Sequence, residues 1–430
     1  MKTKLLLWCV AACYALVGLG CEVTSDKLQT WKQSMKGAAK IRAAIRDTGQ
    51  KLPIRVEAAT ALGELGLFAP LVEDLKSLED VDRRKLTEAL AAGLVSKMEG
   101  SNPTSSTKVQ LQAKDTLFSV RVEAEKPLQR TIDDKLVRWL VGDWQARGAG
   151  EHSCEKIVSE IGEPAGPVLA ETIGQGGTPP VVSATLLRKV GSEEIRDKAA
   201  ENLVAVAAKE KPVKEQTLHA LGKVGSVKAV AYLDQIANKA GFQERIWALR
   251  ALSLYPHASI VGSMKGIAGD ESLKDDQALL RDEAFTVLEK IDDPQSLDAL
   301  TTFLAVTDEK VRFRAVEAIV SGFKAKGLPK LLEGLSSRYT YKKEDLVDFI
   351  EKDIIELGTS ALPALRSALD SKSWVARIVA ARVLGHIGTK QDIDKLETLA
   401  GDTTKLKGWE GGATIGSEAK AAVKLIRDRK

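Results

Sequence analysis

Cysteine, histidine and aromatic residues are scarce in this chain of 430 residues, which has four cysteines, four histidines and 5% aromatic residues. Three of the cysteines, Cys9, Cys13 and Cys21, precede residue 22, so Cys154 is alone in the body of the chain. A lone cysteine cannot form an internal disulfide. We expect Cys154 to be a small buried side chain.

The scarcity of histidine argues against metal chemistry. His152, His219, His257 and His386 are each isolated in their own segments, and no His-x-x-x-His pair occurs in the sequence. His152 and Cys154 lie close together, but two ligands do not make a metal site. We therefore predict no metal, no cofactor and no catalytic residue.

A strong excess of charge is also absent. The formal net charge is +4, and it falls by two if Lys2 and Lys4 are removed with a leader. This balance gives no electrostatic footprint for a nucleic acid. Residues 174–180 are rich in glycine but lack the lysine of a phosphate loop. We expect neither a nucleic acid nor a small-molecule substrate as a partner.

The first 21 residues have the pattern of an export signal. Lys2 and Lys4 precede an uncharged stretch, residues 5–17, that is too short to span a bilayer comfortably. It ends at Gly18-Leu19-Gly20-Cys21, and the chain is polar from Glu22 onward. This ending resembles the lipobox of bacterial lipoproteins, although that family prefers leucine where Gly18 stands. The alternatives are an ordinary cleaved signal or an uncleaved anchor.

The lipobox resemblance implies where the protein resides. In that family the cysteine thiol receives a diacylglyceryl group and the cysteine becomes the mature N-terminus. We accordingly expect Cys21 to be lipidated and the chain to be held in the bacterial cell envelope, facing the periplasm or the cell surface. The pattern leaves open which of the two membranes carries it.

The chain is rich in short amphipathic helices that recur at a near-constant period. An apolar run that ends in Gly or Asp returns at intervals of 34, 67, 66 and 30 residues, and its final residues are Gly191, Gly225, Asp292, Gly358 and Gly388. Degenerate copies lie near Tyr255 and between residues 322 and 327, inside the two doubled intervals. A period in the low thirties predicts a solenoid.

Two further features are shared by these predicted helix pairs. Pro167, Pro329 and Pro363 stand in the first turn of a second helix, where the missing N–H costs nothing. The first helices, such as residues 311–319 and 374–384, have small alanines at recurring positions, which allow close packing. We expect their Arg and Glu side chains to face solvent.

These segments resemble HEAT and HEAT-like (phycobilisome-lyase type) repeats over roughly residues 52–78 and 158–399. The resemblance implies an all-α, right-handed superhelical α-solenoid of HEAT-like helix pairs. It also implies a non-enzymatic scaffold for protein–protein interactions. A bilin-lyase-like enzyme and a chaperone-type assembly factor are the alternatives.

The predicted organisation has five segments. They are a signal peptide (1–21), an N-terminal capping helix with the first repeats (22–100), an irregular helical insert with a flexible loop (101–150), the repeat array (151–400), and a glycine-rich loop with a C-terminal capping helix (401–430). The first capping helix, residues 27–46, should bury one face that includes Trp31 and Met35. The last, residues 417–427, should begin at an N-cap, Ser417.

One loop has the composition of a contact surface. Arg338, Tyr339 and Tyr341 follow one another between two predicted repeats, and Trp409 stands in the glycine-rich loop. Tyr, Trp and Arg are the side chains that most often anchor interfaces. We predict that these residues bind an envelope protein. The alternative is a solvated loop whose rings fold back on the neighbouring helix.

Overall fold

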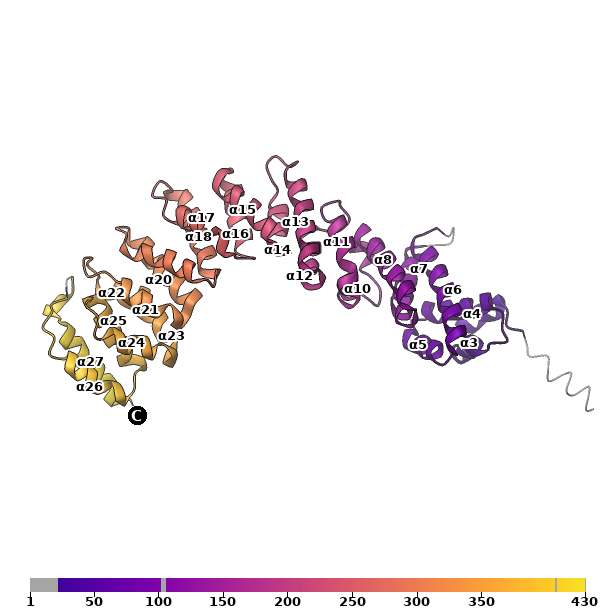
Figure 1. Cartoon of the computed structure of the whole chain (residues 1–430). Coiled ribbons are helices and arrows are strands. Elements are labelled where there is room, and N and C mark those ends of the chain that lie inside the picture. The colour runs from indigo at the N-terminus through magenta and orange to yellow at the C-terminus, as the bar shows by residue number, and fades with distance from the viewer. Residues whose placement is uncertain (1–21, 102–105, 407, 430) are drawn as a thin grey trace, which may run out of the picture. The chain divides into compact units, whose positions relative to one another are not determined.

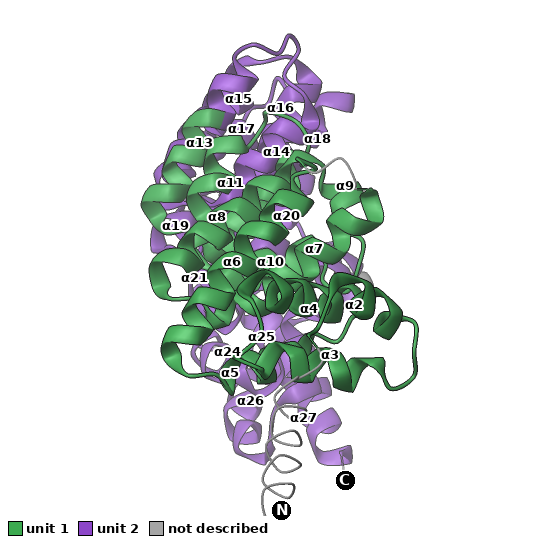
Figure 2. Ribbon diagram, turned by 90° about the vertical axis from the view of Figure 1, so that its right-hand side faces the viewer, with its two compact units in different colours: residues 1–202 green, residues 203–430 purple. Residues whose placement is uncertain are grey.

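The computed structural model describes residues 22–101, 106–406 and 408–429, and these residues are mainly helical (Figure 1). A single bridge between Lys405 and Thr414 is the β-structure found in these ranges. The predicted leader with Cys21 and residues 102–105 of the predicted flexible loop lie outside the described residues. The chain divides into two compact units, Met1–Asn202 and Leu203–Lys430 (Figure 2).

Unit 1 consists of short helices in chain order. They are α2 (Ser25–Lys32), α3 (Gly37–Arg46), α4 (Leu52–Glu64), α5 (Phe68–Lys76), α6 (Asp80–Met98), α7 (Thr107–Val120), α8 (Lys126–Gly142), α9 (Trp144–Arg147), α10 (Cys154–Ile161), α11 (Gly166–Thr172) and α12 (Pro180–Val190). Helix α13 (Glu193–Ala207) crosses the boundary between the units. Neighbouring helices pack on one another, for example α3 on α4 and α6 on α7.

Unit 2 has two rows of helices. The first helices of its pairs are α14 (Glu215–Val224), α16 (Phe242–Leu252), α18 (Ala278–Lys290), α20 (Glu309–Phe323), α22 (Lys343–Leu346) with α23 (Lys352–Glu356), α25 (Trp374–Ile387) and α27 (Ile415–Asp428). The second helices are α15 (Val227–Lys239), α17 (Val261–Ala268), α19 (Pro294–Thr302), α21 (Leu328–Gly334), α24 (Leu362–Ala368) and α26 (Ile393–Leu399). First helices contact the next first helices, so the prediction of an all-α solenoid of HEAT-like helix pairs is confirmed.

The helix ends agree with the repeat pattern. Helices α12, α14 and α25 end one residue before Gly191, Gly225 and Gly388, where the apolar runs predicted their ends. The three predicted prolines stand in the first turns of α11, α21 and α24. Local sequence therefore determines the boundaries of these helices.

The N-terminal capping helix differs from the prediction. Residues 27–46 form two helices, α2 and α3, and Met35 lies fully exposed between them rather than on a buried face. The chain turns so tightly that a Cβ at Gly37 would overlap the backbone carbonyl of Trp31. A periodicity count does not detect such a turn, because Ile41 and Ile45 are buried in either arrangement.

Two other segments also depart from expectation. The segment predicted to be irregular contains two regular helices, α7 and α8, and both contact α6. The last helix begins at Ile415, with Thr414 as its N-cap. Thr414 Oγ1 accepts a bond from Ser417 N (3.1 Å) and Ser417 Oγ accepts one from Thr414 N (3.0 Å), so Ser417 completes a capping box instead of starting the helix.

The arginines of the first helices do not all face solvent, so that expectation is wrong for Arg312. Its side chain is 5% exposed, and its Nη1 donates to the carbonyl oxygens of Val306 (3.0 Å) and Thr307 (2.7 Å), which precede α20. Arg377 binds Ser371 and Lys372 in the same way. Arg55, Arg245 and Arg281 each donate to a carbonyl near the end of the preceding helix, from Ile45, Ala237 and Ala268.

These contacts define an arginine clamp, in which an arginine of one helix binds backbone carbonyls in the last turn of the preceding helix or in the linker that follows that helix. Ile45, Ala237 and Ala268 lie in the last turn of a helix, whose final carbonyls have no partner within the helix and form the negative end of its dipole. A guanidinium supplies a hydrogen-bond donor to such a carbonyl and a positive charge near the negative end of the dipole. The clamp therefore joins consecutive pairs through backbone atoms.

Consecutive first helices also approach closely at recurring glycines. A Cβ at Gly222 of α14 would overlap the carbonyl of Ala251 in α16, and a Cβ at Gly322 of α20 would overlap the carbonyl of Glu289 in α18. The neighbouring element is backbone in both cases, so a rotamer change cannot make room. Glycine is required here because the two helices pack backbone against backbone.

We expect Gly222→Ala to lower the free energy of unfolding by about 1–3 kcal/mol, because the added methyl group overpacks the α14/α16 contact. The matched control is Gly266→Ala in α17, where no atom lies within 4 Å of the added methyl group. The control should instead gain up to about 1 kcal/mol of helix propensity. Urea denaturation of both variants measures the difference, and equal effects would contradict a glycine-specific helix contact.

Candidate functional site

The loop between α21 and α22 places Arg338 and Tyr339 on the surface of unit 2. The hydroxyl of Tyr339 and Nη2 of Arg338 (3.0 Å) both donate to the carbonyl of Ala305. The Arg312 guanidinium lies 4.3 Å from the centre of the Tyr339 ring, and the Arg338 guanidinium lies 5.0 Å from it. Arg338 is exposed and Tyr339 is half-buried. The two predicted contact residues are therefore accessible and held in place.

Tyr341 has a different environment. Its side chain is 2% exposed and packs edge to face on Trp374, with ring centres 6.4 Å apart. Burial raises the pKa of the Tyr341 hydroxyl, and the Arg312 guanidinium partly opposes this rise. Tyr341 thus folds back into the core, as the alternative interpretation expected, and partner contact stays a prediction for Arg338 and Tyr339.

Trp409 lies beside this loop although it is distant in sequence. Its indole Nε1 donates to the carbonyl of Tyr341 (2.9 Å), 68 residues earlier in the chain. Lys343 Nζ and the Arg382 guanidinium each lie 5.7 Å from the centre of its ring. The structure therefore brings together all four residues that the sequence singled out, with Trp409 as a half-buried bridge.

Arg382, which lies against the Trp409 ring, forms ion pairs that the sequence analysis did not predict. Arg382 donates to Glu351 (2.7 Å) and to Glu418 (2.6 Å). Glu351 is 2% exposed and belongs to a π-helical segment, Val347–Glu351. Burial raises the pKa of its carboxyl, and the hydrogen bond from Arg382 opposes the rise. The one available signal was spacing, because 31 and 36 residues separate these partners, close to one repeat.

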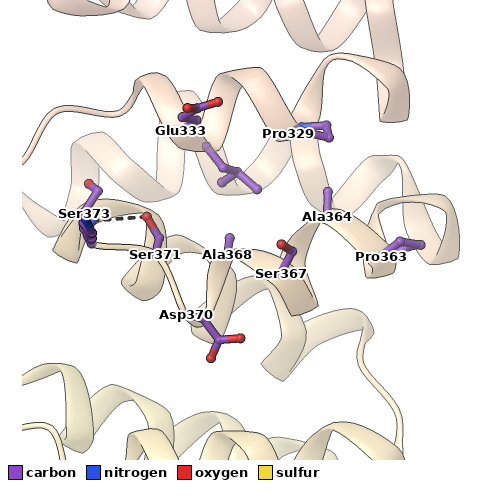
Figure 3. Close-up of a pocket in the computed structure, with 11 residues that line it drawn as sticks. Pro329, Glu333, Pro363, Ala364, Ser367, Ala368, Asp370, Ser371 and Ser373 are labelled. Atoms are coloured by element: carbon purple, nitrogen blue, oxygen red, sulfur yellow. Dashed lines mark hydrogen bonds between the residues drawn. The ribbon is translucent and has the colours of Figure 1, made fainter.

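An open groove of about 810 Å³ lies between α21 and α24 (Figure 3). Pro329 and Glu333 line one side, and Pro363 and Ser367 line the other. At its end Asp370 pairs with Lys395, 2.7 Å away. Small and mixed side chains of this kind are typical of a furrow between neighbouring repeats, whereas enclosed ligand pockets are mostly apolar with a few convergent polar groups.

In unit 1, Cys154 is buried as expected. Its thiol lies 3.5 Å from the carbonyl of Trp144, and burial raises its pKa to about 12. A thiol with such a pKa is almost entirely protonated at neutral pH, so it is a poor nucleophile.

Lys114 is the residue of unit 1 that sequence reasoning missed. Its side chain is fully buried, and Nζ donates to the carbonyls of Ala149 (2.7 Å) and His152 (2.6 Å) and pairs with Asp115 (3.0 Å). Asp115 in turn accepts from the backbone N–H groups of Glu151 and His152. Lys114 and Asp115 together hold the loop that precedes α10.

Two findings apply to the described residues as a whole. Among them, no group of three or more His, Cys, Asp or Glu side chains is placed to hold a metal ion. No helix in the same ranges has both the length and the apolar character needed to cross a bilayer.

No family model and no curated protein matches this sequence. Among solved structures, the chain is similar to the karyopherin Kap121p bound to the SUMO protease Ulp1p, at 14% identity and a TM-score of 0.37, over 91% of this chain and 45% of that one. The structure of Kap121p bound to Pho4p is similar at 14% identity and a TM-score of 0.36, over 92% of this chain and 50% of that one. The structure of human deoxyhypusine hydroxylase in complex with glycerol is similar at 14% identity and a TM-score of 0.19, over 80% of this chain and 98% of that one. The chain thus spans about half of Kap121p.

We expect the stability of unit 1 to fall as the pH drops below about 6.5, because burial and the nearby Lys156 ammonium lower the pKa of His152. Lys114 acts in the same direction, while Asp115 and Glu151 oppose it. The unfolded chain then binds more protons than the folded one, so acid favours unfolding.

The measurement is hydrogen exchange of α7 and α10 at pH 7.5 and 5.5, corrected for intrinsic exchange rates. His152→Gln should remove most of the pH dependence, whereas His386→Gln, at an exposed position of α25, should leave it unchanged. An equal acid response in wild type and His152→Gln would assign the effect to other groups.

Proposed function

We propose that the protein is a non-enzymatic scaffold for protein–protein interactions, tethered to a membrane of the bacterial cell envelope. The observation that carries this proposal is the pair of helix rows in unit 2, with Arg338 and Tyr339 on the surface between two pairs. Solenoids of this kind offer extended surfaces on which large partners bind. An aromatic ring and a guanidinium on such a surface suit the centre of an interface.

The support around Arg338 and Tyr339 favours binding. Both side chains donate to the carbonyl of Ala305, and Arg312 packs against the Tyr339 ring from within the repeat. Ordering a flexible side chain on binding costs about 0.5–1.5 kcal/mol, and a side chain that is already held loses less. The pair therefore has the character of preformed anchors for an envelope protein.

Lipidation of Cys21 would supply the tether. Helix α2 begins at Ser25, four residues later. At about 3.5 Å per extended residue, a lipid on Cys21 would hold the start of unit 1 within roughly 14 Å of the membrane. A scaffold held so close would meet partners that lie on or in the same membrane.

We expect Arg338→Ala with Tyr339→Ala to lower the recovery of crosslinked envelope proteins by about tenfold or more, since each tenfold corresponds to roughly 1.4 kcal/mol of lost contact energy. Crosslinking pull-downs from native envelopes measure recovery, and thermal melting of the purified variant is measured alongside. Arg130→Ala, at an exposed position of α8, is the control. A fall in melting temperature that accounts for the lost recovery would assign the two residues a structural role instead.

We expect radiolabelled palmitate to enter the wild-type protein and to be lost in Cys21→Ala, because the thiol of Cys21 is the proposed acceptor. The variant should also remain unprocessed or leave the membrane fraction. Cys154→Ala serves as the control, since its buried thiol is inaccessible to a transferase. Equal incorporation in wild type and Cys21→Ala would remove Cys21 from the proposal.

A further inference from the structure

Two crevices flank α16 on the face of unit 2 that is formed by the first helices α14, α16 and α18. The crevice between α14 and α16 has a volume of about 330 Å³ and contains Trp247 and His219. The crevice between α16 and α18 has a volume of about 500 Å³ and contains Phe242 and Leu279. Arg250 of α16 lines both, so the two crevices adjoin.

Large apolar side chains are accessible in both crevices. Trp247 and Phe242 are half-buried, and Leu279 is 39% exposed. Their backbone positions are fixed, because all three belong to helices that pack on the next first helix. Rigid aromatic and aliphatic groups in crevices with polar rims are the usual anchors of protein interfaces.

The rims of the crevices are negatively charged. Exposed carboxylates line them, namely Glu215 in the crevice between α14 and α16, and Asp275, Asp276 and Asp282 in the crevice between α16 and α18. The cation between the crevices does not balance this charge, because Arg250 Nε binds the carboxylate of Glu283 at 2.7 Å. Partial burial raises the pKa of Asp282, and the guanidinium groups of Arg314 and Arg281 oppose that rise more strongly than Glu283 and Glu317 add to it.

The geometry limits the shape of the occupant. The two crevices are staggered along α16, because one begins at Phe242 and the other reaches Leu254, and both include Arg250. Packed helices lie about 8–10 Å apart, so the crevices are separated by a distance on the order of 10 Å. Two turns of an α-helix rise about 10.5 Å, which places side chains seven residues apart over the two crevices. An amphipathic helix laid across α16 could therefore fill both crevices from one face.

We propose that these crevices dock a basic amphipathic helix of a partner protein, with apolar side chains two turns apart in the crevices and Lys or Arg side chains facing the four carboxylates. This surface is distinct from the one formed by Arg338 and Tyr339, where Arg338 supplies a positive charge. The scaffold would then hold two partners, or two parts of one partner, on unit 2.

The test uses the full chain and a roughly 20-residue helical peptide with Leu at two-turn spacing and Lys on its flanks, labelled for fluorescence anisotropy. A peptide of the same composition in scrambled order and a version with Glu in place of Lys are the comparison probes. We expect the basic peptide to bind at least tenfold more tightly than either. Its affinity should fall as salt rises, because the rim carboxylates are exposed.

Two variants assign the binding to the crevices. Leu279→Ser and Asp276→Lys should each weaken the basic peptide by about tenfold, and both change exposed positions, where substitutions usually cost little stability. Arg338→Ala with Tyr339→Ala should leave the affinity for the basic peptide unchanged. A failure of the crevice proposal is therefore distinguishable from a failure of the proposal that Arg338 and Tyr339 bind a partner.

Equal binding of the scrambled peptide, or an affinity unchanged in both crevice variants, would overturn the proposal. Self-association of the protein that Leu279→Ser abolishes would also overturn it, because the occupant would then be a second copy of this chain.

Discussion

At five places in the array, an arginine donates to backbone carbonyls at or just after the end of the preceding helix. This clamp recurs at Arg55 of α4 and at Arg245, Arg281, Arg312 and Arg377, which belong to first helices of unit 2. Because the acceptor is backbone, the clamp sets where one pair ends and where the next begins, whatever side chains the linker carries. The array can thus vary in its surface residues while its pair-to-pair geometry is kept.

Arg312 shows how the clamp supports a surface. Its Nη1 binds two carbonyls before α20, and the same guanidinium lies against the ring of Tyr339. The loop that carries Tyr339 is therefore attached to the part of the repeat that holds the solenoid together. The two surfaces of unit 2 also differ in charge, since one offers Arg338 and the other offers carboxylates such as Asp275 and Asp276.

The sequence predicted the features of this fold that depend on local pattern. Helix ends at Gly191, Gly225 and Gly388 follow from apolar runs and glycine, and they agree with the structure. Met35 and Arg312 were misjudged, because an exposed turn and a buried guanidinium both depend on backbone groups that a periodicity count does not include.

For the candidate site the sequence identified residue types but not their surroundings. Tyr339 and Tyr341 stand two positions apart in one loop, yet one is accessible and the other is packed on Trp374. The contact of Tyr341 with Trp409 joins residues separated by two helix pairs, a distance over which neither helical period nor turn chemistry carries information. The sequence therefore predicts the repeats and the residue types in their loops, whereas the burial and the partners of those residues depend on tertiary contacts.

The bond from the Trp409 indole to the Tyr341 carbonyl has a consequence for cooperativity. In a one-dimensional array each pair is coupled to its nearest neighbours, so fraying proceeds from the end one pair at a time. This bond reaches past two helix pairs, α22 and α23 with α24 and then α25 with α26, and links the segment before α27 to the segment before α22. It is a second-neighbour coupling, which makes the C-terminal end open as a block of several pairs rather than by single steps.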